Sequence, residues 1–572
     1  MNLHAVYHKP RGNYAYFDSP DTVFLLFRAG RGDLKNVEVF YFDKYIHKET
    51  LTKTKMEKYM DDVLFSYYRV RIKPPYKRLA YYFRAAGKDG TLLYYDEFGF
   101  HENDAGCWLR AFQMPYINEP DVIRIPEWAK HAVFYHIFPD SFARSGGGFE
   151  GDPKWGSEPH PRRHLGGDLR GMIDNFSYIK ELGVNALYLC PIFASNTCHR
   201  YNTRDYRTID PRLGTMEDFA EFLALCHSNG VRVLLDAVFN HTCDTFPAFL
   251  DVIEKGEASP YKDWYFIRSW PVKVDGEYRY DRFAFTPHMP KLNTGNPEAA
   301  EYLLDTAEFW TKTGIDGWRL DVANEVDLAF WRGFRRRVKA VNPDALILGE
   351  MWNDSLPYLA GDTADSVMNY PFFTACREFF LSGEIDAEGF RNIISGRLAA
   401  YPYPMVYAMY NLLGSHDTSR WLTEAKGDLR KVILSMVFQF TFVGMPVIYY
   451  GDETAMEGEN PIQARRCMDF NPGEKGQTLL ALCKKLVSLR KQSRALREGD
   501  FAWLETPGSL LGSLRTAEGE RVWVYINNSR EDAMFTEGPP GEADLALSSG
   551  GDAGGSRIEP FGYRVYQKCS SS

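Results

Sequence analysis

The chain has 572 residues and a formal net charge of −9, so it exceeds the size of one compact core and is predicted to form two to four domains. The acidic balance argues against nucleic acid as a ligand, because phosphate binding requires a basic surface. The nine cysteines have no regular spacing and do not predict a disulfide framework.

No apolar run approaches the ~18 residues that a membrane helix needs. The first residues, MNLHAVYHKP, lack the basic and apolar regions of a signal peptide. We therefore expect a cytoplasmic protein with neither a nucleic acid nor a membrane as partner.

Residues 1–120 are predicted to form an N-terminal all-β sandwich. Apolar runs such as TVFLLFRAG (22–30) and NVEVFYFDKY (36–45) alternate with turn residues at the spacing of sandwich strands. The segment NEPDVIRIPEWAK (118–130) carries two prolines and indicates a linker to the next domain.

Residues 121–495 alternate apolar strands with amphipathic helical patterns eight times. AVFYHIFPD (132–140) precedes GMIDNFSYIKELG (171–183), for example, and IDGWRLD (315–321) precedes DLAFWRGFRRRVKAV (327–341). Continuous apolar strands are typical of a parallel sheet buried on both faces, and eight successive units favour a (β/α)8 TIM barrel over an open doubly wound sheet. The long stretch 243–293 after the third strand predicts a small inserted subdomain.

Residues 496–572 return to short strands, such as FAWLE (501–505) and RVWVYINN (521–528), and predict a C-terminal all-β sandwich. The predicted fold class is therefore α/β: a TIM barrel with a small insertion after strand 3, flanked by two β-sandwich domains.

Polar side chains follow several of the predicted barrel strands. Because the carboxyl ends of barrel strands meet at one mouth, these side chains are expected to face one cleft. In chain order they are Asp236, Asn240 and His241 after the third strand, Arg319 and Asp321 after the fourth, Glu350 after the fifth, His416 and Asp417 after the seventh, and Asp452 and Glu453 after the eighth.

Two of these carboxylates suit different chemical tasks. The period of two along a strand places Arg319 and Asp321 on the same side, so Arg319 is expected to lower the pKa of Asp321 and keep it ionised as a nucleophile. Glu350 has no cation near it in sequence and could stay protonated as a general acid. An anion and an acid about 5–5.5 Å apart are the catalytic pair of a retaining glycosidase.

Each residue alone also has a structural interpretation. An Asp at a strand end is often a helix N-cap, and a single His in a loop is more often structural than catalytic. The combination of four strand ends favours a catalytic site, because a purely structural role would leave several charges poorly paired.

Four segments resemble the principal motif regions of the α-amylase family, glycoside hydrolase family 13: DAVFNH (236–241), GWRLDVANE (317–325), ILGEMW (347–352) and LLGSHDT (412–418). MPKLN (289–293) and VANE (322–325) resemble the branch of neopullulanases, cyclomaltodextrinases and maltogenic amylases. The leading β-domain is similar to the N-terminal starch-binding-type module of that branch.

The resemblance implies Asp321 as nucleophile, Glu350 as acid/base and Asp417 as transition-state stabiliser. It also implies a set of substrate-binding residues around them. Arg319, His241 and His416 would contact the sugar in the cleaved subsite, and Tyr201 would stack beneath it. Asp236 and Asn240 are further substrate-binding candidates, and Trp352, Phe283 and Glu325 would serve neighbouring subsites.

This sequence departs from the branch in three places. The loop after the first barrel strand (140–168) is glycine-rich where the branch often binds calcium; Gly166 and Asp168 match half of such a site, and a closed shell of ~6–8 oxygens is not evident. No cofactor or metal is therefore required, and calcium is the one ion that the resemblance leaves open. Asn202 and Asn353 replace residues that bear on substrate preference.

By resemblance we expect hydrolysis of α-1,4-glucosidic bonds of cyclodextrins, maltodextrins or pullulan through a covalent glycosyl-enzyme, with α-1,6 cleavage and transglycosylation left open. The branch also implies a homodimer formed through the N-terminal domain. The alternatives are an α-1,6-glucosidase or glucanotransferase of the same family and, more remotely, a non-catalytic carbohydrate-binding barrel.

Overall fold

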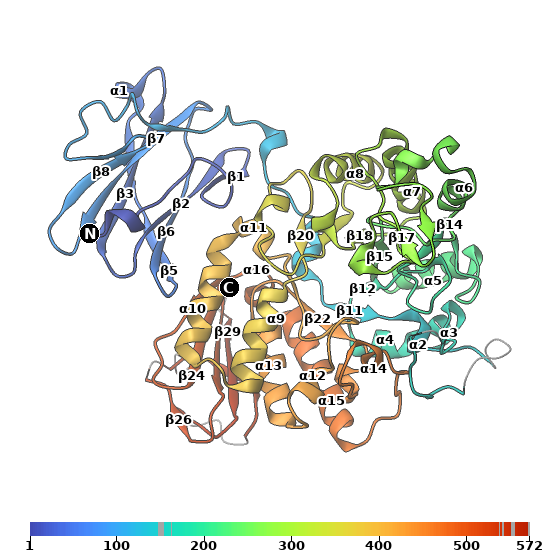
Figure 1. The fold of residues 1–572 in the computed structure, drawn as a ribbon. Coiled ribbons are helices and arrows are strands. Elements are labelled where there is room, and N and C mark those ends of the chain that lie inside the picture. Colours follow the sequence, from blue (N-terminus) through green and yellow to red (C-terminus); the bar gives the residue numbers. More distant parts are fainter. Residues whose placement is uncertain are drawn as a thin grey trace.

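The computed structural model describes residues 1–146, 154–161, 163–536, 538–539, 541, 543–550 and 555–569. An N-terminal β-domain, a central barrel and a C-terminal β-domain follow one another along the chain (Figure 1). Each helix of the described residues is too short or too polar to cross a lipid bilayer.

The N-terminal domain consists of two antiparallel sheets around an apolar core. The inward residues of the long strands are fully buried, as alternating apolar patterns predict. The first sheet has the order β1 (Ala15–Ser19), β2 (Thr22–Gly30), β6 (Phe65–Ile72), β5 (Glu57–Asp61); the second has the order β4 (Thr52–Lys55), β3 (Leu34–Asp43), β7 (Leu79–Gly87), β8 (Leu92–Asp96), β9 (Gly99–His101), with β10 (Phe112–Gln113) paired to β7.

The central domain is an eight-stranded parallel sheet that curls into a barrel. Apart from the exposed Arg232 at the start of one strand, its strand residues are buried, which explains their continuous apolar sequences. In spatial order they are β20 (Ser366–Val367), β19 (Leu346–Gly349), β18 (Gly317–Leu320), β15 (Arg232–Ala237), β12 (Ala186–Leu189), β11 (Phe134–Ile137), β22 (Met445–Tyr449) and β21 (Tyr410–Asn411).

The barrel closes between its two shortest strands. β20 and β21 contain two residues each, and in the described part of the chain the isolated bridge Met368–Tyr410 joins them at this edge. The predicted fold class, a TIM barrel flanked by β-domains, is confirmed. The joint between β20 and β21 is where the barrel has the shortest strand pairing.

Helices cover the outside of the barrel (Figure 1). Several begin at a side-chain cap; Thr215 and Asp218 form a reciprocal capping box at the start of α5. The main helices are α3 (Leu169–Asp174), α4 (Phe176–Leu182), α5 (Met216–Ser228), α7 (Pro297–Lys312), α8 (Leu328–Val341), α9 (Tyr370–Cys376), α10 (Ala387–Ala400), α13 (Leu429–Thr441) and α15 (Glu474–Gln492).

Two excursions leave the barrel at its carboxyl end. After β12 the chain forms the hairpin β13 (Phe193–Ser195) and β14 (Thr203–Ile209), which sequence patterns did not predict. After β15 the stretch 243–293 contains α6 (Pro247–Lys255) and the short hairpin β16 (Lys273–Val274) and β17 (Glu277–Tyr278).

The C-terminal domain is a five-stranded antiparallel sheet with a second, two-stranded sheet beside it. The first has the order β23 (Asp500–Trp503), β24 (Leu510–Ala517), β25 (Glu520–Asn527), β29 (Tyr563–Cys569), β27 (Asp544–Ser548), and the second pairs β26 (Ala533–Met534) with β28 (Arg557–Ile558).

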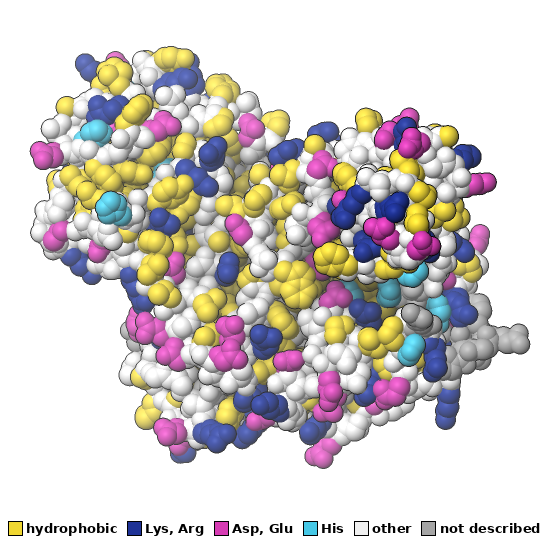
Figure 2. Space-filling model, in the orientation of Figure 1, with side chains coloured by type: hydrophobic (Ala, Val, Ile, Leu, Met, Phe, Trp, Pro, Cys, Tyr) yellow, Lys and Arg dark blue, Asp and Glu magenta, His cyan; other side chains and the backbone are white. Residues whose placement is uncertain are grey.

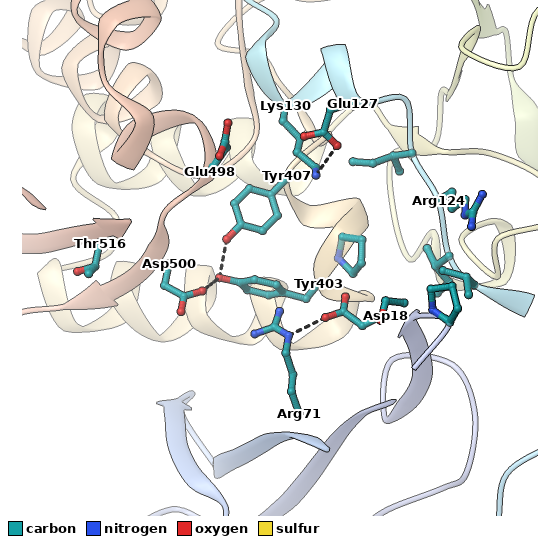
Figure 3. Close-up of a pocket in the computed structure, with 16 residues that line it drawn as sticks. Asp18, Arg71, Arg124, Glu127, Lys130, Tyr403, Tyr407, Glu498, Asp500 and Thr516 are labelled. Atoms are coloured by element: carbon teal, nitrogen blue, oxygen red, sulfur yellow. Dashed lines mark hydrogen bonds and ion pairs between the residues drawn. The ribbon is translucent and has the colours of Figure 1, made fainter. Parts of the chain in front are cut away.

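A cavity of about 700 Å³ lies where the three domains meet (Figure 3). Its polar groups are matched in pairs: Arg71 contacts Asp18 at 2.7 Å, and Lys130 contacts Glu127 at 2.7 Å. Tyr407 donates to the Tyr403 hydroxyl. None of the site residues predicted from the sequence lines this cavity.

Candidate active site

A second cavity, of about 470 Å³, opens at the carboxyl ends of the barrel strands. Histidine side chains gather beside a hollow in the barrel part of the molecular surface (Figure 2). The cavity is lined by His199, Tyr201, His241, Phe283, Met289, Asp321, Val322, Asn324, Glu350, Trp352, His416, Asp417 and Arg465.

Arg319 is the central cation of this site. It projects from β18, is fully buried, and its Nη1 lies 2.6 Å from Oδ1 of Asp321. The same nitrogen contacts both oxygens of Asp236 at 3.0 Å, while Nη2 lies 2.7 Å from Oε2 of Glu350. One guanidinium therefore fixes three carboxylates from three neighbouring strands.

The contact between Arg319 and Asp321 is confirmed, but the expectation that Arg319 lowers the pKa of Asp321 below its usual range is wrong. Burial raises the pKa of Asp321 well above its usual range; Arg319 opposes this effect, whereas Asp236 and Glu350 add to it. Arg319 thus positions the nucleophile but does not keep its pKa low, because burial outweighs the charge that Arg319 shares among three carboxylates.

Glu350 is held by the backbone of the preceding strand end. Val322 N–H donates to Oε2 of Glu350 at 3.0 Å, and the Trp352 indole N–H donates to Oε1 at 3.4 Å. Val322 adopts a left-handed conformation with φ of 45°, which is strained for a β-branched residue. Such strain at a strand end is typical of a site whose geometry is fixed for function.

Asp417 lies in a cationic environment on the opposite wall. Oδ2 lies 3.0 Å from His416 Nε2, and Oδ1 accepts from Arg465 at 3.2 Å. Burial alone would raise the pKa of Asp417, but His416 and Arg465 hold it well below its usual range. Burial likewise opposes the charged form of His416, yet Asp417 raises the pKa of His416 to about 10.

Aromatic rings form the remaining walls. The Tyr201 ring stacks on His416 with centroids 5.2 Å apart, and its hydroxyl donates to Asp236 at 2.9 Å. Phe283 stacks on His241, whose pKa burial lowers to about 4. Flat apolar faces beside hydroxyl and imidazole donors suit a sugar ring.

Trp352 forms the outer edge of the cavity. It is 47% exposed and stacks on the buried Tyr370 with a centroid separation of 3.6 Å. A partly exposed indole with a fixed orientation offers a surface on which a further sugar unit can stack.

Four of the predicted site residues do not line the cavity but lie beneath it or beside it. Arg319 and Asp236 lie beneath it, fully buried. Asn240 is also buried and donates to Glu325 Oε2 at 3.2 Å; Lys291 contacts both Asn240 and Glu325. The structure thus gathers Asp321, Glu350, Asp417, His241, His416, Tyr201, Trp352 and Phe283 around the cavity and places Asn240 and Glu325 just outside it.

The expectation that the acids after the eighth strand face the cleft is wrong. Asp452 pairs with Arg420 at 3.0 Å, and Glu453 accepts from the hydroxyls of Tyr135 and Tyr178 at 2.6 and 2.7 Å. Gly451 turns the chain with a φ of 92°, which directs both acids back into the core.

Sequence reasoning missed Arg465 and His199. Arg465 comes from the loop beyond β22 and donates its Nε–H to the carbonyl of His416 at 2.9 Å. His199 accepts from the backbone N–H of Tyr201 at 3.1 Å, and burial lowers its pKa to about 3. Neither follows a barrel strand directly, so the strand-end rule could not identify them.

The described part of the loop after β11 does not fit a calcium shell. Asp168 caps α3 and accepts from Ser145 and from Gly171, and Asp140 accepts from the Leu165 N–H. The oxygens of both acids therefore face protein donors. Residues 147–153 and 162 of this loop lie outside the described residues.

Comparisons with known proteins agree with this geometry. The family model described as "Alpha amylase, catalytic domain" matches residues 136–472, and "Alpha amylase, N-terminal ig-like domain" matches residues 1–118.

A cyclomaltodextrinase of Bacillus sp. is 45% identical over 93% of this chain and 96% of its own length. Neopullulanase 2 of Thermoactinomyces vulgaris is 43% identical over 93% of this chain and 92% of its own length. A solved cyclomaltodextrinase structure superposes with a TM-score of 0.92 at 41% identity, covering 100% of this chain and 98% of the other. The chain therefore belongs to the α-amylase family of glycoside hydrolases.

Proposed function

We propose that this glycosidase hydrolyses α-1,4-glucosidic bonds of cyclodextrins, maltodextrins or pullulan with retention of configuration. The observation that carries the proposal is the bridging of Asp321 and Glu350 by one guanidinium, with Asp417 in the same cavity. Two carboxylates that contact the terminal nitrogens of one guanidinium can flank a single glycosidic bond, and in a retaining pair they stand ~5–5.5 Å apart. The names of the relatives point to the same substrate class.

The residues divide the reaction into two displacements. Glu350 donates its proton to the glycosidic oxygen while Asp321 forms a bond to the anomeric carbon and the C–O bond breaks. Glu350 then takes a proton from water, whose oxygen displaces Asp321 and restores the free enzyme. Asp417, ionised by its cationic neighbours, stabilises the positive charge that develops on the sugar in both transition states.

Replacing Asp321 by Asn tests the proposal. We expect kcat on β-cyclodextrin to fall by at least about 10⁴-fold, because no covalent intermediate can form. The thermal unfolding transition should remain cooperative. Asp344→Asn is a suitable control, since Asp344 is exposed and lies outside the cavity. Near-normal hydrolysis by the Asp321 variant would refute the assignment.

Product analysis separates the proposed activity from its family alternatives. The same enzyme is incubated with β-cyclodextrin, pullulan and isomaltose, and the products are resolved by chromatography. Rapid opening of the cyclodextrin to maltose supports the proposal. Cleavage of isomaltose alone would instead indicate an α-1,6-glucosidase, and longer products than the substrate would indicate a glucanotransferase.

We also propose that two copies associate through the N-terminal domain. Figure 2 shows hydrophobic side chains over this domain, and several large ones are exposed. Ile46 precedes His47, whose ring stacks on Trp108 at 4.1 Å, which joins the loop after β3 to the loop after β9. The Glu97 N–H, in the turn between β8 and β9, donates to the Arg110 carbonyl, so this turn and the two loops form one patch. Patches of this kind mark protein interfaces. Its members are Tyr45, Ile46, Phe98, Trp108 and Leu109.

Sedimentation velocity tests the association. The parent chain should sediment as a dimer, and the double variant Phe98→Ser, Leu109→Ser should sediment as a monomer at the same concentration. A parent chain that stays monomeric at micromolar concentration would contradict the proposal.

We place the enzyme in the cytoplasm. All nine cysteines are free, and seven of them are buried, which is typical of a reducing compartment. Fractionation of the source cells into cytosol, membrane and medium checks this placement.

A further inference from the structure

Three potential metal ligands lie together beneath the sugar-binding wall of the active site. His136 belongs to β11, Cys190 directly follows β12, and His416 lies in the loop after β21. Their ligand atoms all lie within 4.8 Å of one another, and each residue is at most 1% exposed. Within the described parts of the chain, this is the one such group of histidine, cysteine and acid side chains.

The distances between these atoms are close to those between the ligands of a tetrahedrally coordinated zinc ion. Zn–N bonds of about 2.0–2.1 Å and Zn–S bonds of about 2.3 Å place tetrahedral ligand atoms about 3.3–3.6 Å apart. Here Nε2 of His136 lies 3.2 Å from Nδ1 of His416 and 3.3 Å from Sγ of Cys190. Two of the three ligand–ligand distances therefore lie within a few tenths of an ångström of those around zinc, and the third, from His416 to Cys190, is at most 4.8 Å.

The outer contacts support a ligand role for His416. Its Nε2 contacts Asp417 at 3.0 Å and the Tyr201 hydroxyl at 2.7 Å, so coordination through Nδ1 would complete a carboxylate–histidine–metal arrangement. Nδ1 of His136 is buried without a hydrogen-bond partner in the described structure. This nitrogen lacks the acceptor that usually orients a metal-bound imidazole, which favours a reversible site over a permanent structural one.

The donor set selects the kind of ion. Two imidazoles and one thiolate prefer zinc and similar soft ions over calcium or magnesium, which take oxygen ligands. Three protein ligands leave the fourth position of zinc for water. Cys190 releases its thiol proton on coordination, and the ion displaces any proton on Nδ1 of His416.

We propose that His136, Cys190 and His416 form an inhibitory zinc site, which the ion reaches through the active-site cavity. His416 lines that cavity, whereas the other two ligands lie behind it, so the ion enters past the bound-sugar position. A dication beside Asp417 opposes the positive charge that develops on the sugar, and it fixes an imidazole that the substrate needs. Occupancy therefore blocks turnover without displacing Asp321 or Glu350.

Cobalt provides the test of the site itself, because Co²⁺ bound to a thiolate in tetrahedral geometry absorbs through a sulfur-to-metal charge-transfer band. The metal-free full chain is titrated with Co²⁺, and zinc is then added to displace it. We expect one Co²⁺ per chain with this band in the parent chain. Cys190→Ser should lack the band, and His136→Gln should bind at least tenfold more weakly.

Cys198→Ser is the matched control, because Cys198 precedes the cavity residue His199 but is not a member of the cluster. Thermal melting identifies any variant that fails to fold. If either Cys190→Ser or His136→Gln does not fold, the cobalt titration of the remaining one tests the site. A charge-transfer band of equal intensity in the Cys190 variant, or no band in the folded parent chain, would overturn the proposal.

Inhibition is the second readout and rests on the proposed glycosidase activity. Each variant is compared with its own metal-free rate on β-cyclodextrin. Zinc should inhibit the parent chain and the Cys198 variant alike, whereas the half-inhibitory concentration should rise at least tenfold in Cys190→Ser. Identical zinc inhibition of all the variants would refute the inhibitory role. The cobalt spectrum remains interpretable even if the proposed substrate is wrong.

Discussion

The single positive charge of Arg319 is shared by three carboxylates. Asp236, Asp321 and Glu350 all contact its guanidinium, and each is buried. An excess of negative charge in a dry site favours retention of a proton by the cluster. Within the cluster, burial together with Asp236 and Glu350 raises the pKa of Asp321. The proposed mechanism requires the shared proton to be on Glu350, and Asp321 to be ionised, once the substrate is bound.

Arg465 holds Asp417 from a loop that is remote from the motif regions. Arg465→Gln removes a charged hydrogen bond to Asp417, worth about 1.5–3 kcal/mol, so we expect kcat/KM to fall by about 10–150-fold. Arg466→Gln is the matched control, because Arg466 pairs with the exposed Glu158 and does not line the cavity. Equal losses in both variants would show that the effect is not specific to Asp417.

The pair His416–Asp417 predicts a pH-dependent contribution to stability. The pKa of His416 is about 10 in the folded chain and about 6.5 when unfolded. Its stabilisation is therefore complete below about pH 6.5 and is lost as pH rises towards 10. Asp417, whose folded pKa is lowered, stays ionised throughout this range.

Denaturant unfolding of His416→Gln and of the parent chain checks this sign. The difference in their free energies of unfolding should be largest near pH 6 and should shrink as pH approaches 10. A difference that is constant across the range would mean that packing, and not charge, accounts for the role of His416 in stability.

The sequence could predict site residues that lie at a strand end or in the loop that follows it. Asp321 and Glu350 directly follow β18 and β19, and Asp417 lies in the loop after β21; barrel topology brings these strand ends to one mouth. The rule fails where the backbone turns sharply, as Gly451 does ahead of Asp452, and where a distant loop folds back, as at Arg465. Their catalytic roles remain predictions that the substitutions above test.

At the scale of elements, apolar runs predicted the buried strands but not the exposed ones. β22 is buried throughout, β15 is buried after its first residue, and both were evident as continuous apolar sequences. β14 buries only Thr203, Tyr206 and Ile209 of the sequence TRDYRTI, which resembles a polar loop. This missed hairpin matters because the turn between β13 and β14 carries Tyr201 to the cavity.

The capping box of α5 gives a prediction at this scale. The Thr215 hydroxyl accepts from the Asp218 N–H, and Asp218 accepts from the Thr215 N–H at 2.9 Å. Thr215→Ala should lower the free energy of unfolding by about 0.5–2 kcal/mol and leave kcat/KM unchanged. Ser228→Ala, at the other end of the same helix, should change stability by less than about 0.5 kcal/mol. A larger loss in the Ser228 variant would contradict this account.

For the whole molecule, the N-terminal domain is tied to the barrel by buried polar contacts. The Tyr16 hydroxyl accepts from the Tyr403 N–H at 2.9 Å, and the Asn13 amide donates to the Ala399 carbonyl at 2.8 Å. Arg69 of the same domain contacts Asp500 of the C-terminal domain at 3.4 Å. These contacts indicate that the three domains unfold together.

Tyr16→Phe tests this coupling. The substitution leaves the buried Tyr403 N–H without its acceptor, so we expect a loss of about 1–3 kcal/mol in the free energy of unfolding. Calorimetry should still show one transition, at a lower temperature. Tyr7→Phe, on an exposed ring of the same domain, should have little effect. Two separate transitions in the parent chain would refute the coupling.

The joint between β20 and β21 has a consequence for motion at the active site. Among the described residues, few backbone hydrogen bonds connect the two edges of the barrel at this joint; one runs from the Asn369 N–H to the Tyr410 carbonyl. Deuterium should therefore replace the amide protons of this joint sooner than those of β12 or β15. Tyr370 begins the helix that leaves the joint, and its ring supports Trp352 beside Glu350. Transient separation of the two strands would thus loosen the outer wall of the cavity and give a branched or cyclic glucan room to enter.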